Sequence, residues 1–414
     1  MTGHLDTLMR LPPESRWRQA RPWISAGDRS FFAALRHDAP LLRLPQVTVA
    51  SRFADCEEIL RRHDLFSVSL YRPKQGDYLM AQDDTAQHWR EKSLMKCVLD
   101  FEDLPGIRDF CADTSQRLLA AGGGAFDAVE GLTRAMPLAL VQERFGFDQA
   151  DPRELFEASY WSQMDAFWNQ PFDERADAAE IVAKREAGNV TLGRYVAALV
   201  QRRSAELAAG VTRDDPVTRL ILLVKSGGLR HLTPERLVRN VGGLLIGAVE
   251  TTSHAVCNAV EFFLAHPGLL AAAREAARSA DKEQLDGHVF EALRFSPAFP
   301  YFFRTVTTPT VLGRGEPHEL MLEPGETVIA LSHAAMFDER AVSAPETFDP
   351  RRGLTANFVF GLGIHECLGR AIGAVMIPEI VRQALLLDGL ETDPIDTRGG
   401  PVPEAWKWRW RVAG

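Results

Sequence analysis

Residues 360–369, the most informative stretch of the chain, read Phe-Gly-Leu-Gly-Ile-His-Glu-Cys-Leu-Gly. It presents a single cysteine, Cys367, on a glycine-rich loop, and an apolar helical pattern begins directly after it. A helix that starts there would direct its N-terminal N–H groups and positive dipole end at the sulfur, which favours the anionic thiolate. Glycines at positions 361, 363 and 369 would let the loop backbone lie against a flat group.

Three explanations of this cysteine can be compared. A zinc site is disfavoured because no second cysteine or histidine pair lies nearby at ligand spacing. A buried free cysteine in a turn is the commonest role of a lone cysteine. A single thiolate also suits a metal whose other ligands come from a macrocycle, and haem iron is such a metal. The flanking Phe-Gly-x-Gly-x-His-x-Cys-x-Gly pattern favours the haem interpretation.

The loop resembles the cysteine loop of the haem-thiolate cytochrome P450 monooxygenases in their soluble bacterial form, and the resemblance extends over nearly the whole chain. It implies a mostly α-helical fold, with about a dozen helices and small peripheral β-sheets, that forms one domain over residues 1–414. It also implies haem b (iron protoporphyrin IX) as the cofactor and Cys367 as the iron ligand. Phe360, Gly361, His365 and Gly369 would then contact the haem.

Composition restricts the location and partners of the protein. The 414 residues include 47 basic and 56 acidic side chains, which argues against general nucleic-acid binding. The five cysteines are odd in number and irregularly spaced, so a reduced cytoplasmic setting is favoured over a disulfide framework. The N-terminus lacks an apolar signal region, and the apolar run 241–249 is far short of the ~20 residues of a membrane helix. We expect a soluble cytoplasmic monomer without a membrane or nucleic-acid partner.

Hydrophobic periodicity predicts mostly helices with a few short strands. A strand is expected at 47–50, and further short strands are expected at 305–330. Helices are expected at 53–62, 115–121, 132–145, 185–207, 234–266 and 368–387. Pro378 should kink the last of these helices or mark a local break in it.

The predicted helix 234–266 contains three glycines, at positions 242, 243 and 247. Each weakens a helix by roughly 1 kcal/mol relative to alanine. Thr233 can cap this helix, and Pro234 suits its first turn. The cost of the glycines suggests that another group approaches the helix backbone closely.

Residues 247–252, Gly-Ala-Val-Glu-Thr-Thr, resemble the segment of the family's central helix that crosses the distal face of the haem. The family more often has Ala-Gly where this chain has Gly247 and Ala248. Glu250 and Thr251 then resemble the family's acid–alcohol pair, which supplies the protons that O–O cleavage requires. The alternative is that Glu250 forms a salt bridge and that Thr251 bonds back to its own helix.

A second set of residues resembles the family's structural ion network. Glu291 and Arg294 are three positions apart on one predicted helix, a spacing that commonly gives a surface pair. Arg352 lies in Phe-Asp-Pro-Arg-Arg, residues 348–352, where the family places the arginine that joins this pair. The expected role is to hold the cysteine loop. Residues 335–338, Ala-Met-Phe-Asp, depart from the family's commoner Asn-Arg-Asp run.

Haem propionates need cationic or donor groups, and four residues match the family's positions for them: His88, Lys92, Arg304 and His365. Lysine at 92 replaces the commoner arginine and would bind as a point charge. For each of these residues alone, a solvated side chain is the favoured interpretation, whereas the four together form a coherent anion site. Lys92 and Lys96 are also possible docking charges for an electron donor.

Aromatic residues gather in segments that line the family's substrate cavity, and we expect some of them to form an apolar wall. Core packing is the alternative for most of them. The candidates are Trp161, Met164, Phe167, Trp168, Gly247, Phe299, Tyr301 and Phe302.

The resemblance implies a monooxygenase that inserts one atom of O2 into a small or medium apolar molecule, by hydroxylation. Electrons would come from a separate ferredoxin or flavodoxin. One alternative is a peroxygenase driven by H2O2, which would be expected to lack an intact acid–alcohol pair. The other is a haem-thiolate sensor without enzymatic activity, which would need a signalling or DNA-binding element.

Overall fold

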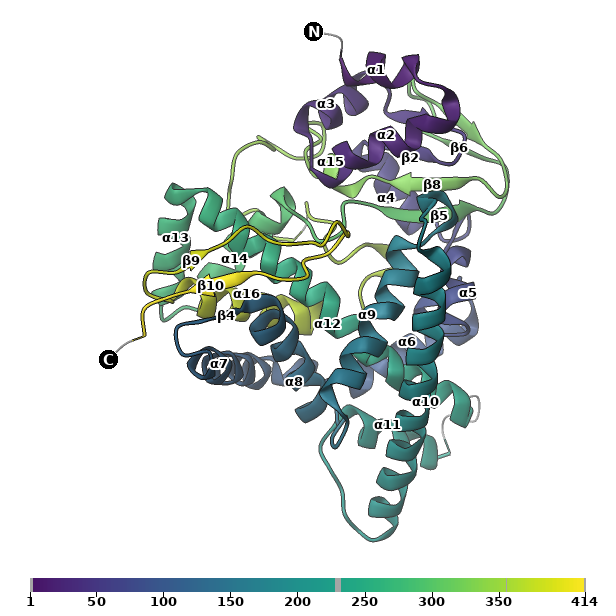
Figure 1. Ribbon diagram of the computed structural model, residues 1–414. Helices are drawn as coiled ribbons and strands as arrows, with labels where there is room; N and C mark the ends of the chain where they lie inside the picture. Colours follow the sequence, from purple (N-terminus) through teal and green to yellow (C-terminus); the bar gives the residue numbers. More distant parts are fainter. Residues whose placement is uncertain (1–2, 228–231, 355, 413–414) are drawn as a thin grey trace.

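Helix α12 (Pro234–Ala265) runs through the middle of the computed structural model, which describes residues 3–227, 232–354 and 356–412 (Figure 1). Thr233 caps its first turn by accepting a hydrogen bond from the Arg236 amide, and Pro234 occupies a position where no N–H is needed. Most of the side chains along α12 are buried, so neighbouring helices enclose it. Helices α8, α9, α10, α14 and α16 all pack against α12.

The remaining helices begin and end as follows: α1 (His4–Arg10), α2 (Pro13–Ser25), α3 (Arg29–Asp38), α4 (Phe53–Arg61), α5 (Arg72–Gln75), α6 (Ala86–Val98), α7 (Leu104–Ala121), α8 (Ala135–Glu143), α9 (Pro152–Trp168), α10 (Ala178–Ala208), α11 (Pro216–Lys225), α13 (Pro267–Arg278), α14 (Glu283–Phe295), α15 (Ser332–Ala335) and α16 (Arg370–Leu385). Side-chain oxygens of Asp28, Thr85, Asp151 and Asp215 cap α3, α6, α9 and α11. These caps satisfy N–H groups that have no partner inside the helix.

Three small sheets lie at the edges of the helical body (Figure 1). The largest has the strand order β1 (Leu41–Arg43), β2 (Thr48–Ala50), β8 (Thr327–Ala330), β5 (Phe302–Val306), β3 (Phe66–Ser67). Strands β2 and β8 pair in parallel, with Val49 opposite Ile329, and the other described pairs of this sheet are antiparallel. A second sheet joins β4 (Ala125–Asp127), β10 (Lys407–Arg409) and β9 (Glu391–Thr392), and a hairpin joins β6 (Thr310–Leu312) to β7 (Leu320–Leu322).

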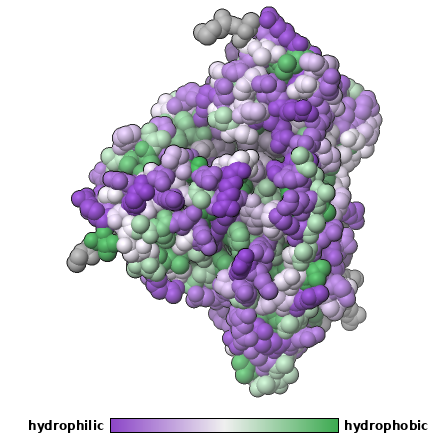
Figure 2. All heavy atoms as spheres, in the orientation of Figure 1, coloured by the Kyte–Doolittle hydropathy of each residue, from purple (hydrophilic) through white to green (hydrophobic). Residues whose placement is uncertain are grey.

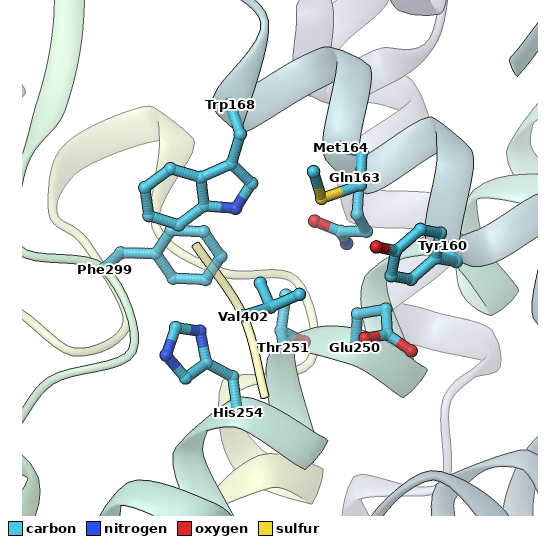
Figure 3. A pocket seen from close by; sticks show the side chains of 9 residues that line it. All are labelled: Tyr160, Gln163, Met164, Trp168, Glu250, Thr251, His254, Phe299 and Val402. Atoms are coloured by element: carbon cyan, nitrogen blue, oxygen red, sulfur yellow. The ribbon is translucent and has the colours of Figure 1, made fainter. Parts of the chain in front are cut away.

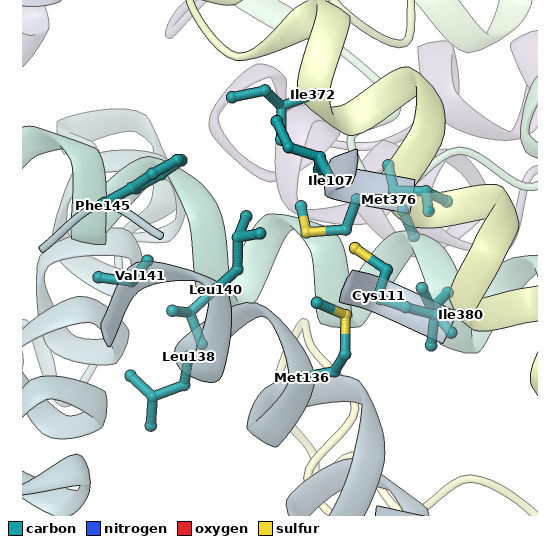
Figure 4. Packing of buried hydrophobic residues seen from close by; sticks show 14 of the residues in the cluster. Ile107, Cys111, Met136, Leu138, Leu140, Val141, Phe145, Ile372, Met376 and Ile380 are labelled. Carbon is teal, nitrogen blue, oxygen red and sulfur yellow. The ribbon is translucent and has the colours of Figure 1, made fainter. Parts of the chain in front are cut away.

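The largest hydrophobic core forms where α7, α8 and α16 meet beside α12 (Figure 4). Cys111 of α7, Met136 of α8 and Ile380 of α16 are all completely buried there. Burying one such side chain contributes about 1.5–3 kcal/mol. This packing fixes α16, and with it the loop that precedes α16, relative to the central helix.

The predicted mostly helical fold with small peripheral sheets is confirmed, with sixteen α-helices in the described part of the chain instead of about a dozen. Several boundaries differ from the prediction. Helix α7 starts at Leu104, well before the predicted 115, because Pro105 suits its first turn and Ile107 and Cys111 extend the buried face. A π-helical turn (Val129–Arg134) precedes α8, and Pro378 lies inside a continuous α16.

The surface that faces the viewer in Figure 2 is mostly hydrophilic, with apolar residues scattered over it. Within the described ranges, no individual helix is both long and apolar enough to cross a membrane. Only the sharply bent pair α12 and α13 meets those criteria of length and composition, and only when its two helices are taken together.

Candidate active site

The cysteine loop is closed by its own backbone. The Cys367 amide donates to the Phe360 carbonyl at 2.8 Å, and the Gly361 amide donates to the Phe358 carbonyl at 2.8 Å. Gly361 and Gly363 have φ of 66° and 72°, a conformation that other residues rarely adopt. A Cβ at Gly363 would lie 2.5 Å from the Leu60 carbonyl oxygen, so this loop contacts the end of α4.

The Cys367 thiol is free and half-buried. Burial raises its pKa, while a hydrogen bond from the Gly369 amide and the nearby charge of Lys92 act in the opposite direction. Helix α16 begins at Arg370, so the Gly369 amide lies at its N-terminal end, where the helix dipole also favours an anion, whereas Lys92 approaches from α6. The local structure therefore favours the thiolate form once a metal replaces the proton.

An opening lies in the middle of the otherwise buried α12. Gly247 is exposed there, whereas the residues from Val241 to Leu245 and again Val249 are buried. A Cβ placed on Gly247 would meet no atom within 4 Å, so the space beside it is free. One turn earlier, a Cβ on Gly243 would lie 2.2 Å from the ring of Tyr78. The expected close approach to the helix backbone therefore occurs at Gly243, and its partner is Tyr78.

Four basic side chains meet at one edge of the cysteine loop. Arg304, His88 and Lys92 all lie close enough to His365 to oppose its protonation, although burial is the main reason why the pKa of His365 falls to about 2. Both ring nitrogens of His365 are buried without a hydrogen-bond partner. In the described part of the chain, Arg304 forms no salt bridge, and its one hydrogen bond goes to the Phe303 carbonyl.

Buried cations without an acidic partner are costly. The cations Arg304 and Lys92, together with the N–H groups of the neutral His88 and His365 rings, therefore fit a bound dianion such as the two propionates of a haem. The free space beside Gly247 fits a flat ring. Lys92 is 6% exposed, and its Nζ donates to the carbonyls of Ile364 and Glu366. The expectation that Lys92 is a docking charge for an electron donor is therefore wrong, because this amine points into the protein.

Glu291, Arg294 and Arg352 lie in contact. Arg294 donates from Nε and Nη2 to the two Glu291 oxygens, each at 2.9 Å, and Arg352 Nε donates to Glu291 Oε1 at 3.3 Å. The Asp349 amide also donates to Glu291 Oε1 at 3.0 Å. Arg294 Nη1 further donates to the Met336 carbonyl, which ties α14 to the segment after α15. Both guanidiniums contact the single Glu291 carboxylate, and backbone carbonyls of Met336, Pro345 and Ser343 accept their remaining N–H groups.

Phe337 explains part of the departure at residues 335–338. The guanidinium of Arg29, from the first turn of α3, lies 3.0 Å from the centre of the Phe337 ring, and that of Arg294 lies 4.2 Å from it. Asp338 Oδ2 accepts a hydrogen bond from the Phe53 amide at the start of α4. Where the family more often has an arginine, this chain has the Phe337 ring. Arg29, from the N-terminal region, stacks on that ring.

Thr251 and Glu250 lie on adjacent positions of α12 but make different contacts. Thr251 Oγ1 donates to the Gly247 carbonyl at 2.7 Å. Glu250 is 5% exposed, and its carboxylate forms a salt bridge with Arg134, with 2.9 Å between Arg134 Nε and Glu250 Oε1. Both contacts that sequence analysis left as the alternative are therefore present: Thr251 bonds back to its own helix, and Glu250 forms a salt bridge.

Arg134 is shared between two carboxylates. Its Nη2 lies 3.3 Å from Glu404 Oε2, and Glu404 in turn accepts a hydrogen bond from the Tyr160 hydroxyl. One guanidinium cannot neutralise two ionised carboxylates, and burial disfavours the surplus negative charge. Burial raises the pKa of Glu250 to about 7, with Glu404 adding to the rise and Arg134 opposing it. Glu250 can therefore hold a proton near neutral pH.

A small cavity lies beside this pair (Figure 3). Its lining residues come from α9, α12, the segment after α14 and the C-terminal loop: Tyr160, Gln163, Met164, Trp168, Glu250, Thr251, His254, Phe299 and Val402. Of the predicted pocket residues, Met164, Trp168 and Phe299 line it. Trp168 and Phe299 stack with their ring centres 5.7 Å apart.

The other predicted pocket residues do not line this cavity. Trp161 lies under Lys184, Phe167 packs between Tyr71 and Phe299, and Tyr301 packs against Trp17. Phe302 lies 3.9 Å from the Cβ position of Gly361, and Gly247 borders the free space already described. Their segments are close to the cavity, but the side chains of Trp161 and Tyr301 point to other partners.

Sequence reasoning missed several residues that the fold brings to this site: Tyr78, Arg134, Tyr160, Gln163, His254 and Glu404. No local pattern identifies them, because their partners lie far away along the chain. One signal was available for His254, which follows Thr251 by three positions and so shares its helix face.

Comparisons with known proteins agree with this geometry. The family model "Cytochrome P450" matches residues 54–387. The erythromycin C-12 hydroxylase of Saccharopolyspora erythraea is 28% identical over 342 residues, which cover 80% of this chain and 80% of the hydroxylase. The cyclomarin C epoxidase CymV of Salinispora arenicola is 26% identical over 397 residues, which cover 91% of this chain and 94% of the epoxidase.

A solved structure shares the fold. The crystal structure of the cytochrome P450 enzyme CYP109B1 from Bacillus subtilis superposes with a TM-score of 0.74 at 21% sequence identity, covering 92% of this chain and 98% of that one.

Proposed function

The chain belongs to the cytochrome P450 family of monooxygenases, and from this premise we propose that it inserts one atom of O2 into a small or medium, mostly apolar organic molecule. The observation that supports the proposal most directly is the half-buried Cys367 thiol on a glycine loop, rimmed by basic side chains that lack an acidic partner. Hydroxylation is the proposed reaction, in keeping with the hydroxylase among its relatives.

We propose that Cys367 holds a haem b, which supplies O2 activation when bound. His88, Lys92, Arg304 and His365 would pair with its propionates. Phe360, Gly361 and Gly369 would lie against its proximal face, and Ala248 against the opposite face. The small side chains at 247 and 248 leave the room that a planar macrocycle needs.

Glu250 and Thr251 are proposed to manage protons. Glu250 can hold a proton near neutral pH, and Arg134, which also contacts Glu404, holds its carboxylate in place. The Thr251 hydroxyl borders the cavity, where it could pass a proton onward by releasing the Gly247 carbonyl. The buried salt bridge keeps Glu250 oriented between turnovers.

Electrons are proposed to come from a separate ferredoxin or flavodoxin, with residues 1–414 acting as one monomeric domain in the cytoplasm. Use of H2O2 in place of O2 and electrons is the rival activity. The intact pair at 250 and 251 favours O2, because a proton supply is needed when O2 is reduced at the site. A sensor without turnover is the remaining alternative.

Two measurements test the proposal. The reduced protein with CO should show the red-shifted Soret band of a thiolate-ligated haem, and a folded protein that takes up no haem would refute the assignment. Turnover with NADH, a ferredoxin and its reductase should exceed turnover with H2O2 alone. Product from H2O2 only would identify a peroxygenase, and no product under either condition would leave the sensor.

A further inference from the structure

Gln163 offers an unused hydrogen-bond acceptor to the cavity. Its side chain extends from α9 toward the space between Met164 and Thr251 (Figure 3). The amide Nε2 donates to the Ile246 carbonyl on α12, which fixes which end of the amide is nitrogen. The other end, Oε1, is buried without a partner, and the residue as a whole is only 5% exposed.

His254 offers a second unused polar atom to the same cavity. It lies one turn after Thr251 on α12, and its Nδ1 is buried without a hydrogen-bond partner. Burial lowers the pKa of His254 to about 4, so the ring is neutral at pH 7. A neutral imidazole presents one donor and one acceptor and can therefore serve a group of either kind.

Most of the remaining cavity wall is apolar or already paired. Phe299, Met164, Val402 and the carbon atoms of the Trp168 ring present apolar surface, the Trp168 indole N–H is a donor beside it, and the Glu250 carboxylate is engaged by Arg134 (Figure 3). A cationic ligand would find no free anion in this wall, and an anionic ligand would face the bare Gln163 oxygen. Buried polar groups in native proteins almost always have partners, so an uncharged donor from a ligand is the complement that the two atoms lack.

We propose that Gln163 and His254 select substrates that carry a hydroxyl group on an otherwise apolar skeleton. The hydroxyl donates its proton to Gln163 Oε1, and His254 bonds to the hydroxyl oxygen or to a second polar group of the same molecule. The aromatic pair Trp168 and Phe299 holds the carbon skeleton. This inference rests on the proposed monooxygenase function and assigns its substrate class.

The test is a spectral titration of the haem-loaded protein with matched compounds. Adamantane, 2-adamantanone and 1-adamantanol share one skeleton. Adamantane has no polar group, the ketone offers an acceptor only, and the alcohol offers both a donor and an acceptor. Cyclododecane, cyclododecanone and cyclododecanol form a second set. We expect the alcohol of at least one set to bind roughly three- to tenfold more tightly than its ketone and hydrocarbon, the range expected for one hydrogen bond.

Gln163→Leu should abolish the preference for the alcohol, and Gln163→Met should do the same if the leucine variant is poorly folded. Gln142→Leu is the matched control, because the Gln142 amide also donates to a backbone carbonyl, that of Ala150, but lies on α8 outside the cavity. His254→Phe should weaken binding of the alcohols while retaining that of the hydrocarbons.

The inference is overturned if the wild type binds the alcohols no better than their ketones and hydrocarbons, or if both Gln163 variants keep the preference. Water alone would then satisfy the two atoms. These results are independent of the proposed function, whose failure would appear as the absence of the thiolate CO band in every variant and in the wild type.

Discussion

Arg134 Nε lies 2.9 Å from Glu250 Oε1, although the two residues are 116 positions apart, and the same guanidinium also contacts Glu404. The carboxylate beside Thr251 is therefore held in place by a partner from the π-helical turn before α8. Since two carboxylates share one cation in a buried site, one proton can be retained among them. This arrangement makes Glu250 both a positioned group and a titratable one.

The stability of the protein should depend on the protonation of Glu250. Its pKa is raised from 4.5 to about 7 in the folded state, so the folded protein binds the proton more tightly than the unfolded chain does. Between these two pH values, stability falls as pH rises, by an amount on the order of 3 kcal/mol. Glu250→Gln should remove this decrease in stability between pH 5 and pH 7, which is measured from the urea midpoints of the variant and the wild type at the two pH values. A variant with the same pH dependence of stability as the wild type would contradict the prediction.

Thr251→Ala should separate electron consumption from product formation. The variant removes the Thr251 hydroxyl and leaves the helix intact, because among the described residues this side chain bonds to the Gly247 carbonyl alone. We expect product per electron to fall by about tenfold or more, with peroxide released instead. Thr251→Ser is the control that keeps the hydroxyl and should largely retain coupling. Equal coupling in all three proteins would mean that another group delivers the proton.

Cys367→Ser should eliminate the thiolate CO band and the O2-dependent activity while far-ultraviolet circular dichroism remains unchanged. The reason is that a serine hydroxyl is a poor replacement for the anionic sulfur that the Gly369 amide and Lys92 support. Cys97→Ser, at an exposed cysteine, should leave the spectrum as it is. A normal band in the Cys367 variant would show that another residue binds the iron.

Arg352→Met should lower the haem content of the purified protein. The change leaves Glu291 with one fewer cation and frees the carbonyls of Ser343, Ala344 and Thr347. Because Arg294 still pairs with Glu291, the change should cost about 1.5–3 kcal/mol, as expected for loss of a hydrogen bond to a charged group. The neighbouring Arg351→Met removes a side chain that is 89% exposed, paired only with Asp349, and should cost no more than about 1 kcal/mol. Equal haem content in both would argue against the network's role.

Lys92→Met and Lys96→Met should have opposite consequences. Lys92 is buried against the cysteine loop, so its loss should lower haem retention, measured as haem transfer to apomyoglobin. Lys96 is exposed on the same helix, so its loss should leave haem retention unchanged and slow reduction by the electron donor at low salt. Slower reduction with Lys92→Met at unchanged haem content would contradict this division of roles.

Residues close in sequence were the ones that could be interpreted in advance. The glycines of the cysteine loop lie within a few positions of one another, so their spacing alone indicated a turn. Glu291 and Arg294 are three positions apart, so their spacing indicated a shared helix face. The partner of Gly243 could not be foreseen, because Tyr78 reaches that glycine from a segment 165 residues away in the chain. The same holds for Arg29 on Phe337, where the stacking partner comes from a different region.

Motifs within short stretches of the chain were enough to indicate the resemblance to the family and the single cysteine suited to a haem. Hydrophobic periodicity was enough to indicate a mostly helical fold. Only the tertiary structure decided which side chains face the cavity, that Lys92 points inward, and that Glu250 shares Arg134 with Glu404, which lies 270 positions after that arginine. Such contacts depend on how α6, α9, α12 and the C-terminal loop pack together. The free energy that selects this packing is spread over the whole buried core, so no short stretch of the chain encodes it.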